Sequence, residues 1–194
     1  DDSADKLVIG VGSTVGTNSI LTLDDDSVTV GDGAAVDTKI VFDGNAQDYY
    51  IGLDDSADDL VIGLGSAVGT TPAISIDENQ VTTFGKATVG ATLTDTSNTG
   101  SVTLDFQTSQ NFVLTLTGNV TLANPSTEAV GQSGIMVFIQ DGTGSRTLSL
   151  GTDYETAGGA GITLSTAASA VDVVPYFVKA SGSIQLGAPQ KAFA

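Results

Sequence analysis

The sequence predicts an all-β protein in which a trimeric β-repeat shaft is followed by a C-terminal antiparallel β-sandwich tip. Three observations predict this fold class. The chain is rich in Gly, Thr, Val and Asp and poor in the helix formers Glu, Lys and Arg. Short apolar runs alternate with turn residues along its length. Residues 1–30 return, with substitutions, at residues 54–83.

The repeat has a constant offset of 53 residues. Asp1–Asp5 return as Asp54–Asp58, and Leu7–Gly10 return as Leu60–Gly63. A fixed period of this length is typical of arrays in which each unit buries its apolar face against a neighbour. The chain opens in the middle of a repeat, so we expect it to be the C-terminal part of a longer polypeptide.

Residues 1–86 are expected to form short strands that carry only two or three apolar residues each. The expected strands are Lys6–Val11, Ile20–Leu23, Val28–Gly31, Thr38–Phe42, Tyr49–Leu53, Leu60–Leu64, Ala73–Ile76 and Val81–Phe84. A repeat with so little apolar surface should be marginally stable alone. Three copies packed around an axis would bury the apolar stripes and protect the strand edges, so we expect a homotrimer.

The charge of the chain changes near residue 86. Residues 1–86 carry sixteen acids and three Lys, whereas residues 87–194 carry seven acids and three Lys or Arg. This step predicts two domains, residues 1–86 and residues 87–194. The net charge of −17 argues against a nucleic-acid partner and an anionic membrane surface. Without Cys or His, disulfides, thiolate zinc sites and the commonest general base are excluded. No apolar run is long enough to insert into a membrane.

Residues 87–194 are expected to form a β-sandwich, because many short strands lie within about a hundred residues. The run Ile135–Ile139 suits a central strand or one buried between subunits. Pro175 indicates an edge or a bulge, and Ala167–Ala170 is interpreted as a turn. Further turns are expected at Asn119, Asn124-Pro125 and Asp141–Gly144. The expected strands are Ala87–Leu93, Ser101–Phe106, Phe112–Thr117, Val120–Ala123, Gly134–Gln140, Arg146–Leu150, Ile162–Ser165, Val171–Val178 and Ile184–Leu186.

Four segments together carry a resemblance to known proteins. Phe112–Thr121, Gln140–Leu148 and Ala170–Val174 resemble the C-terminal domain of many bacteriophage tail-fibre proteins, and Phe42–Leu53 is similar to the shaft of marine phage fibres. The resemblance implies a homotrimeric virion appendage with a globular tip. It carries over no catalytic or binding residue.

The function expected from this resemblance is structural and adhesive, in the virion, without enzyme activity or cofactor. The tip would attach to a host surface receptor, a glycan or an outer-surface protein, and gain avidity from its three copies. A missing N-terminal region would bind other virion proteins. The alternatives are a head-attached decoration fibre and a bacterial extracellular filament or surface protein.

Acidic clusters are the candidates for metal binding. Asp24, Asp25, Asp26 and Asp77 could combine with backbone carbonyls to bind Ca²⁺. No EF-hand loop accompanies these residues. Solvated turns in which Asp side chains accept nearby N–H groups are the simpler interpretation, so no metal site is predicted.

The candidate receptor-binding residues are Thr152, Asp153, Tyr154 and Glu155, in a turn-rich loop of the tip. An exposed Tyr on such a loop can act as an anchor, and a loop closed over the sandwich edge is the alternative. Asp153, Glu155 and Asp172 are also the best candidates for a glycosidase carboxylate pair. None of them lies in a recognisable catalytic motif, so no catalytic residue is predicted.

Two local patterns make further predictions. Gly10–Gly16 superficially resembles a dinucleotide-binding fingerprint, but its spacing is wrong and it recurs at Gly63–Gly69. We interpret these glycines as turns or close backbone approaches. Tyr49 and Tyr50 are adjacent, so in a strand one should be packed inward and the other should lie on the surface.

Overall fold

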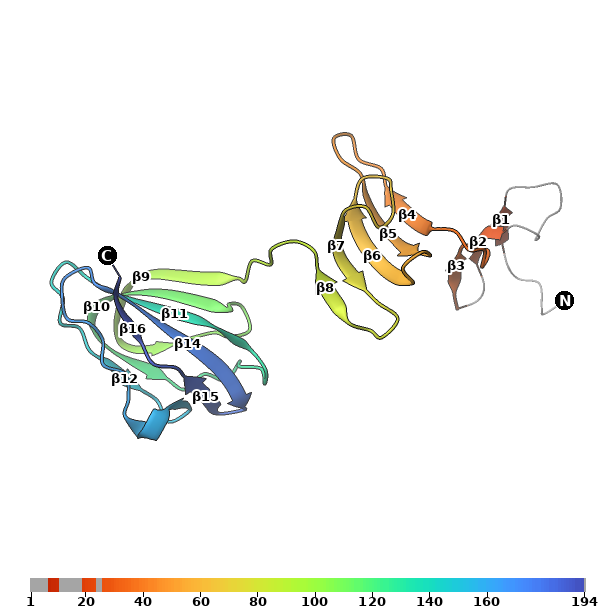
Figure 1. Cartoon of the computed structure of the whole chain (residues 1–194). Coiled ribbons are helices and arrows are strands. Elements are labelled where there is room, and N and C mark those ends of the chain that lie inside the picture. The colour runs from red at the N-terminus through yellow and green to blue at the C-terminus, as the bar shows by residue number, and fades with distance from the viewer. Residues whose placement is uncertain (1–6, 11–18, 24–25, 194) are drawn as a thin grey trace. The chain divides into compact units, whose positions relative to one another are not determined.

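The computed structural model describes residues 7–10, 19–23 and 26–193 (Figure 1). The chain divides into two compact units, Asp1–Thr88 and Val89–Ala194. The predicted boundary after residue 86 lies two residues before this division. Apart from the three-residue 3₁₀ helix η1 (Ala157–Gly159), the described regular elements are strands, which confirms the all-β prediction. Within these ranges no helix has the length and apolar character needed to cross a membrane.

The N-terminal unit contains two antiparallel sheets, in the strand orders β1-β2-β3 and β4-β5-β6-β7-β8. Each strand bound lies within one residue of its predicted position, because alternation and turn residues act locally. Lys6 and Val11, at the ends of the first predicted strand, lie outside the described residues. The strands are β1 (Leu7–Gly10), β2 (Ser19–Leu23), β3 (Val28–Val30), β4 (Thr38–Phe42), β5 (Tyr49–Asp54), β6 (Asp59–Leu64), β7 (Pro72–Ile76) and β8 (Thr82–Phe84).

The two copies of the repeated sequence form hairpins with the same register. Leu7 pairs with Leu23 in β1–β2, and the residues 53 positions later, Leu60 and Ile76, pair in β6–β7. Both hairpins have an irregularity before the pairing of Gly10 or Gly63. The next hairpin differs by one residue, because Leu21 pairs with Val30 but Ile74 pairs with Phe84.

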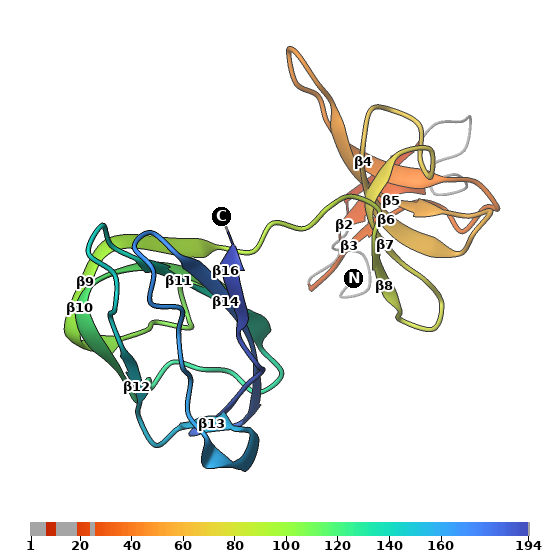
Figure 2. The same cartoon turned by 60° about the vertical axis from the view of Figure 1, so that its left-hand side comes forward.

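All strands of the C-terminal unit belong to one mixed sheet that curls around its core (Figure 2). The central order is β12-β10-β11-β14-β15-β13, with β9 beside β10 and β16 beside β14. The strands are β9 (Thr92–Thr103), β10 (Asn111–Ala123), β11 (Ser133–Gln140), β12 (Leu148–Leu150), β13 (Tyr154–Thr156), β14 (Val171–Ala180), β15 (Ser183–Leu186) and β16 (Gln190–Phe193).

The predicted antiparallel arrangement holds for β14, which pairs antiparallel with β11, β15 and β16, but it is wrong for the rest of this unit. β10 pairs in parallel with β9, β11 and β12, and β13 pairs in parallel with β15. Consecutive strands β9 and β10 can be parallel because the chain between them returns through the interior, where Leu104 and Phe106 are buried. Short strands in sequence suggested hairpins, whereas this return path depends on contacts between distant residues.

The predicted turn at Asn119 is also wrong, since β10 runs without a break through it. The buried residues Phe112, Leu114, Leu116, Val120 and Leu122 share one face of β10. Gly118 lies on the same face of β10. A Cβ at residue 118 would collide with the Thr99 side chain, so β10 passes close to β9 at this point. Asn119 instead accepts a hydrogen bond from the Thr147 N–H.

Several other predicted strand positions in this unit need correction. β9 begins at Thr92 and replaces the predicted strands Ala87–Leu93 and Ser101–Phe106, while β13 and β16 were not predicted. Ile162–Ser165 is not a strand, although Ile162 and Leu164 are buried, because the Ser165 N–H bonds to the Asp172 carboxylate. Buried and exposed residues therefore alternate in this segment although it pairs with no strand.

Three further expectations concern β11, β14 and the segment before β14. β11 is a central strand between β10 and β14, as predicted. Pro175 lies in a central strand, at the point where the neighbour of β14 changes from β16 to β15. Ala167–Ala170 forms the predicted turn.

The two units differ in how much they bury. The C-terminal core contains eighteen buried apolar residues, including the rings of Phe106, Phe112 and Tyr176. The Phe106 ring centroid lies 5.0 Å from that of Phe112 and 5.2 Å from that of Tyr176. Among the described residues of the N-terminal unit, only Tyr50 and Val61 are fully buried large apolar side chains.

Candidate functional site

One face of the β4–β8 sheet is an ordered array of apolar side chains, which we call the open face. Residues paired across antiparallel strands place their side chains on the same face. One row of pairs runs Ile40–Ile51–Ile62–Ile74–Phe84 across all five strands. The neighbouring positions extend it on both sides. The open face comprises Ile40, Phe42, Tyr49, Ile51, Leu53, Leu60, Ile62, Leu64, Ile74, Ile76 and Phe84.

The side chains of the open face are largely uncovered. Nine of its eleven members have exposed fractions between 39% and 58%, from Ile51 and Ile62 to Phe84. None of its members is charged. A continuous apolar surface of this extent is typical of a protein–protein contact rather than of a surface that stays in water.

On the opposite face of the same sheet, the chain itself covers β5 and β6. Tyr50 has 0% of its surface exposed, whereas Tyr49 is 55% exposed, which confirms the predicted division of the two rings. The loop after β6 closes over Tyr50, and the Gly69 N–H donates to the Tyr50 hydroxyl at 3.1 Å. Gly63 has no space for a Cβ beside the Tyr50 ring.

The glycine-rich phrase Gly63–Gly69 therefore forms the end of β6 and a turn, as predicted, and not a phosphate-binding loop before a helix. Gly65 and Gly69 have φ values of +85° and +74°, which an L side chain adopts only under strain. In the first copy, Val11–Gly16 lies outside the described residues.

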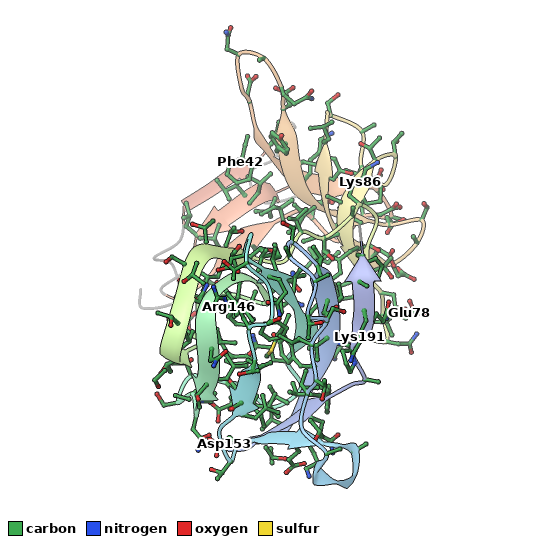
Figure 3. All side chains as sticks on the ribbon, turned by 90° about the vertical axis from the view of Figure 1, so that its left-hand side faces the viewer. Phe42, Glu78, Lys86, Arg146, Asp153 and Lys191 are labelled. Atoms are coloured by element: carbon green, nitrogen blue, oxygen red, sulfur yellow. The ribbon has the colours of Figure 1, made fainter. Side chains whose placement is uncertain are left out.

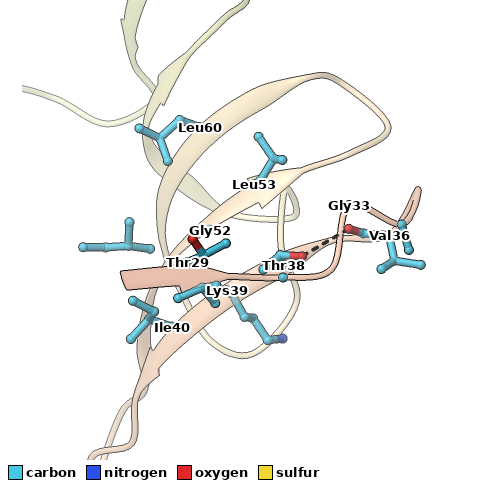
Figure 4. Close-up of a pocket in the computed structure, with 13 residues that line it drawn as sticks. Thr29, Gly33, Val36, Thr38, Lys39, Ile40, Gly52, Leu53 and Leu60 are labelled. Carbon is cyan, nitrogen blue, oxygen red and sulfur yellow. Dashed lines mark hydrogen bonds between the residues drawn. The ribbon is translucent and has the colours of Figure 1, made fainter. Parts of the chain in front are cut away.

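A hollow of about 320 Å³ lies at one side of the open face (Figure 4). Ile40, Leu53 and Leu60 contribute its sheet side, and Val36 contributes from the connection between β3 and β4. The hollow is mostly apolar, so an aromatic or aliphatic side chain from another molecule would suit it better than a polar ligand.

A second hollow, of about 520 Å³, separates the two outermost strands of the C-terminal sheet order, β12 and β13. Its lining includes Ser149, Tyr154, Glu155 and the glycines of the loop after β13. We call it the edge gap. Two of the four candidate receptor-binding residues, Tyr154 and Glu155, line it.

Tyr154 is 6% exposed and belongs to the core, so the interpretation as an exposed anchor is wrong. β13 pairs with β15 there and turns the ring inward, which the loop-like sequence did not indicate. Burial raises the pKa of the Tyr154 phenol, and the Glu128 carboxylate adds to this effect. The Tyr154 hydroxyl and the Glu128 Oε2 have no hydrogen-bond partner within the described part of the chain.

The other three candidates lie nearer to the surface and are held by neighbours. Asn124 donates to the Thr152 hydroxyl at 2.7 Å and accepts the Asp153 N–H at 3.1 Å. Glu155 accepts from the Ser183 hydroxyl at 2.7 Å and from Lys179 at 3.1 Å. The Ser183 hydroxyl and Lys179 lower the pKa of Glu155. Sequence reasoning missed Asn124, for which a turn was the only signal.

The acids considered for a glycosidase pair have structural contacts. Asp172 is buried and accepts the Ser165 hydroxyl at 2.7 Å and the Ala192 N–H at 2.9 Å. Burial raises its pKa, but these hydrogen bonds outweigh burial and lower it. The Asp141 carboxylate forms an ion pair with Arg146 at 2.8 Å. Figure 3 shows Arg146 and Asp153 towards opposite ends of the unit, so the Asp141–Arg146 pair is not close to Asp153.

The candidate metal ligands are only partly described. Asp77 accepts the N–H groups of Asn79 and Val81 with one carboxylate oxygen, as expected of a turn-forming Asp. Asp26 is exposed, and Asp24 and Asp25 lie outside the described residues. Among described residues, no group of three or more acids, His or Cys is placed to hold a metal ion.

The C-terminal unit is similar to one family of known proteins. Residues 98–183, from β9 to the start of β15, match the family model "Putative phage tail fibre C-terminal domain". The match supports a phage tail-fibre protein, as the sequence resemblance implied, and with it a structural, virion-associated role. No curated protein and no solved structure matched the chain.

Proposed function

We propose that this chain is a homotrimeric structural fibre of a phage virion. In this assembly the open faces of three copies close on one another to form a shaft, and the C-terminal unit is the tip presented to the host surface. The single observation that carries the proposal is the open face, an apolar array across five strands that one copy leaves uncovered.

Burial of the open face would stabilise the assembly substantially. Complete burial of one large apolar side chain contributes about 1.5–3 kcal/mol, so completing the burial of a half-exposed one contributes roughly 1 kcal/mol. Nine such side chains therefore offer on the order of 10 kcal/mol per copy, before the entropy of association is subtracted. This is comparable to the whole stability of a small domain.

The repeated sequence supports an extended shaft rather than a single contact. β1–β2 and β6–β7 share one register, so a face built like the open face can recur along the chain. Two copies face to face would also bury it. The number three rests on the resemblance to fibre proteins and on the need to protect strand edges around an axis.

The C-terminal unit is suited to be a tip that faces the host, because all residues of its core belong to the unit itself. The seven residues Gly85–Ala91 link it to β8, so a shaft of three copies holds three tips close together. Three weak receptor contacts then act together through their high effective concentration. Thr152, Asp153 and Glu155, the three candidates that are not buried in the core, are the predicted receptor contacts.

The assembly is tested with two matched variants. Ile62 and Val41 are both 39% exposed, but Ile62 lies on the open face and Val41 on the opposite face. An unpaired charge in a buried interface costs about 3–5 kcal/mol, so Ile62→Asp should give a monomer in analytical ultracentrifugation. Val41→Asp should stay trimeric.

A wild-type chain that sediments as a monomer while its circular dichroism shows intact β-structure would refute the trimer. Attachment is tested separately, by adding the purified chain to host cells before the phage. The wild-type trimer should compete with adsorption, and Thr152→Ala with Asp153→Ala should compete less. Equal competition would remove these residues from the receptor contact.

A further inference from the structure

The C-terminal sheet has an apolar surface of its own, on the side away from its core. Alternate residues of β10, β11 and β14 point outward, opposite to the buried Phe112, Met136 and Val174. Pairing places Val113 beside Val137, and Val137 beside Val173. We call this surface the outer face. Its members are Val113, Ile135, Val137, Ile139, Val171, Val173, Pro175 and Phe177.

The outer face has the composition of an interface. Ile135 and Phe177 are 42% and 46% exposed, and the four valines of the face are half-buried. The surrounding positions Thr94, Thr115, Ser133 and Gln185 are polar but uncharged. Beyond Phe177 and Gln185, at one end of the face, Lys179 and Glu155 form an ion pair at 3.1 Å. An apolar centre with a polar rim and few charges is typical of protein–protein contacts.

The shape of the outer face also favours a specific contact. A shallow recess of about 330 Å³, with a mostly apolar surface, is lined by Phe177 together with Pro175, Gln185 and Gly187. An exposed ring beside an apolar recess gives the outer face a shape that another apolar surface can fit.

We propose that the outer face is a second contact between copies of this chain, which joins the C-terminal units to one another. The proposal rests on the shaft in one respect, because the shaft brings the copies together. It concerns a surface that the shaft does not use.

Two observations favour a second copy over another partner. The chain carries a net charge of −17, so copies repel one another except where a surface lacks acidic groups, and none of the eight members of the outer face is charged. The connection Gly85–Ala91 also tethers each unit to the shaft by seven residues. Short tethers produce effective concentrations of about 1 mM or more, at which even a weak contact forms.

The experiment measures the burial of the two faces independently in the full chain. The protein has no Cys, so single cysteines report one position each. Ile62→Cys reports the open face, Ile135→Cys the outer face, and Val130→Cys, at a site that is 68% exposed and outside both faces, is the control. Each reduced variant is treated with a thiol reagent, and the reaction rate is compared with that of unfolded chain in urea.

We expect residue 135 to react at least about tenfold more slowly than the Val130→Cys control, relative to the unfolded chain, because a contact that is closed nine-tenths of the time gives this protection. The protection should disappear when Phe177→Ser is added, while the chain stays trimeric. Fast reaction at residue 135 in a trimer whose residue 62 is protected would overturn this inference and leave the shaft intact. Protection at residue 135 with fast reaction at residue 62 would support the outer face and refute the shaft.

The Phe177→Ser trimer also distinguishes another occupant. If residue 135 is unprotected and Phe177→Ser reduces competition with phage adsorption, the outer face contacts the host receptor and the inference is wrong. If Phe177→Ser restores fast reaction at residue 135 without changing competition, the contact between copies is confirmed.

Discussion

β10 and β6 show how differently the two units use the same kind of strand. In β10 the apolar side of the strand, from Phe112 to Leu122, is fully buried by the curled sheet around it. In β6 the apolar side, Leu60, Ile62 and Leu64, is exposed, and Val61 and Gly63 on the other side are buried. Both strands alternate, but only β10 finds its cover within one chain.

This difference follows from connectivity. The C-terminal unit has parallel pairings and a return segment through its interior, so residues far apart in sequence enclose a common core. The β4–β8 sheet is a meander of neighbouring hairpins, in which each strand meets only the strands next to it in sequence. In this meander the loop after β6 covers Tyr50 on one face, and the open face has no such cover. The largest expected effect is therefore a loss of stability when a core residue of the C-terminal unit is truncated, compared with truncation of a residue on the open face.

Phe112→Ala should destabilise the C-terminal unit by about 3–5 kcal/mol, because it leaves a cavity in a closed core. Phe42→Ala, on the open face, should leave that unit's stability unchanged and instead weaken assembly. Urea unfolding followed by near-ultraviolet circular dichroism measures the first effect, and sedimentation measures the second. Equal effects of the two variants on C-terminal unfolding would contradict the comparison.

Asp172→Asn should destabilise the C-terminal unit by about 2–3 kcal/mol, since it removes a charged acceptor from the Ser165 and Ala192 groups that surround it. Asp153→Asn is the control, because the half-buried Asp153 carboxylate accepts only a 3.4 Å hydrogen bond from the Thr152 hydroxyl. Thermal unfolding of both variants at neutral pH gives the difference. If Asp172→Asn melts like Asp153→Asn, the carboxylate does not hold β14 and β16 together.

Gly63→Ala sharpens the comparison from the side of the N-terminal unit. A Cβ at residue 63 would lie 2.6 Å from the Tyr50 Cζ, so the ring that forms this unit's small core must move, at a cost of about 1–3 kcal/mol. Gly142→Ala, where a Cβ meets no atom within 4 Å, is the matched control. The N-terminal thermal transition should fall only in Gly63→Ala.

Asp77→Ala should cost about 1 kcal/mol, as the loss of a turn-forming side chain does, because Asn79 and Val81 lose their acceptor. The melting temperature of the N-terminal transition should fall by the same amount in EDTA and in excess Ca²⁺. A wild-type chain that Ca²⁺ stabilises, beside an Asp77→Ala variant that it does not, would assign Asp77 to a metal site instead.

The smallest effect is the response to acid of the C-terminal unit. The hydrogen bond from Arg146 holds the pKa of Asp141 at about 2, below its ordinary value of 3.8. This carboxylate therefore stabilises the fold at pH values above 3.8, and the stabilisation is lost as the pH falls from 3.8 towards 2. The Asp141→Asn variant should lose less stability over this interval. Identical acid unfolding curves would exclude the contribution.

The sequence predicted the N-terminal strands to within one residue, because their bounds depend on alternation and nearby turn residues. It predicted the division between Tyr49 and Tyr50 for the same reason. It misplaced the C-terminal elements where distant contacts decide: the parallel pairing of β9 with β10, the strand formed through Asn119, and the burial of Tyr154 by β15. The open face was only partly visible in sequence, as apolar stripes whose alignment across five strands requires the register.

The amino-acid order by itself determined the β class, the local strands and turns, the repeat and the strong negative charge, since each depends on neighbouring residues or on composition. Only the tertiary structure decided which alternating strands are covered, which carboxylates are held by backbone N–H groups, and where apolar surface remains. Burial is a property of the whole set of strand neighbours, and a residue's neighbours across a sheet are not its neighbours along the chain.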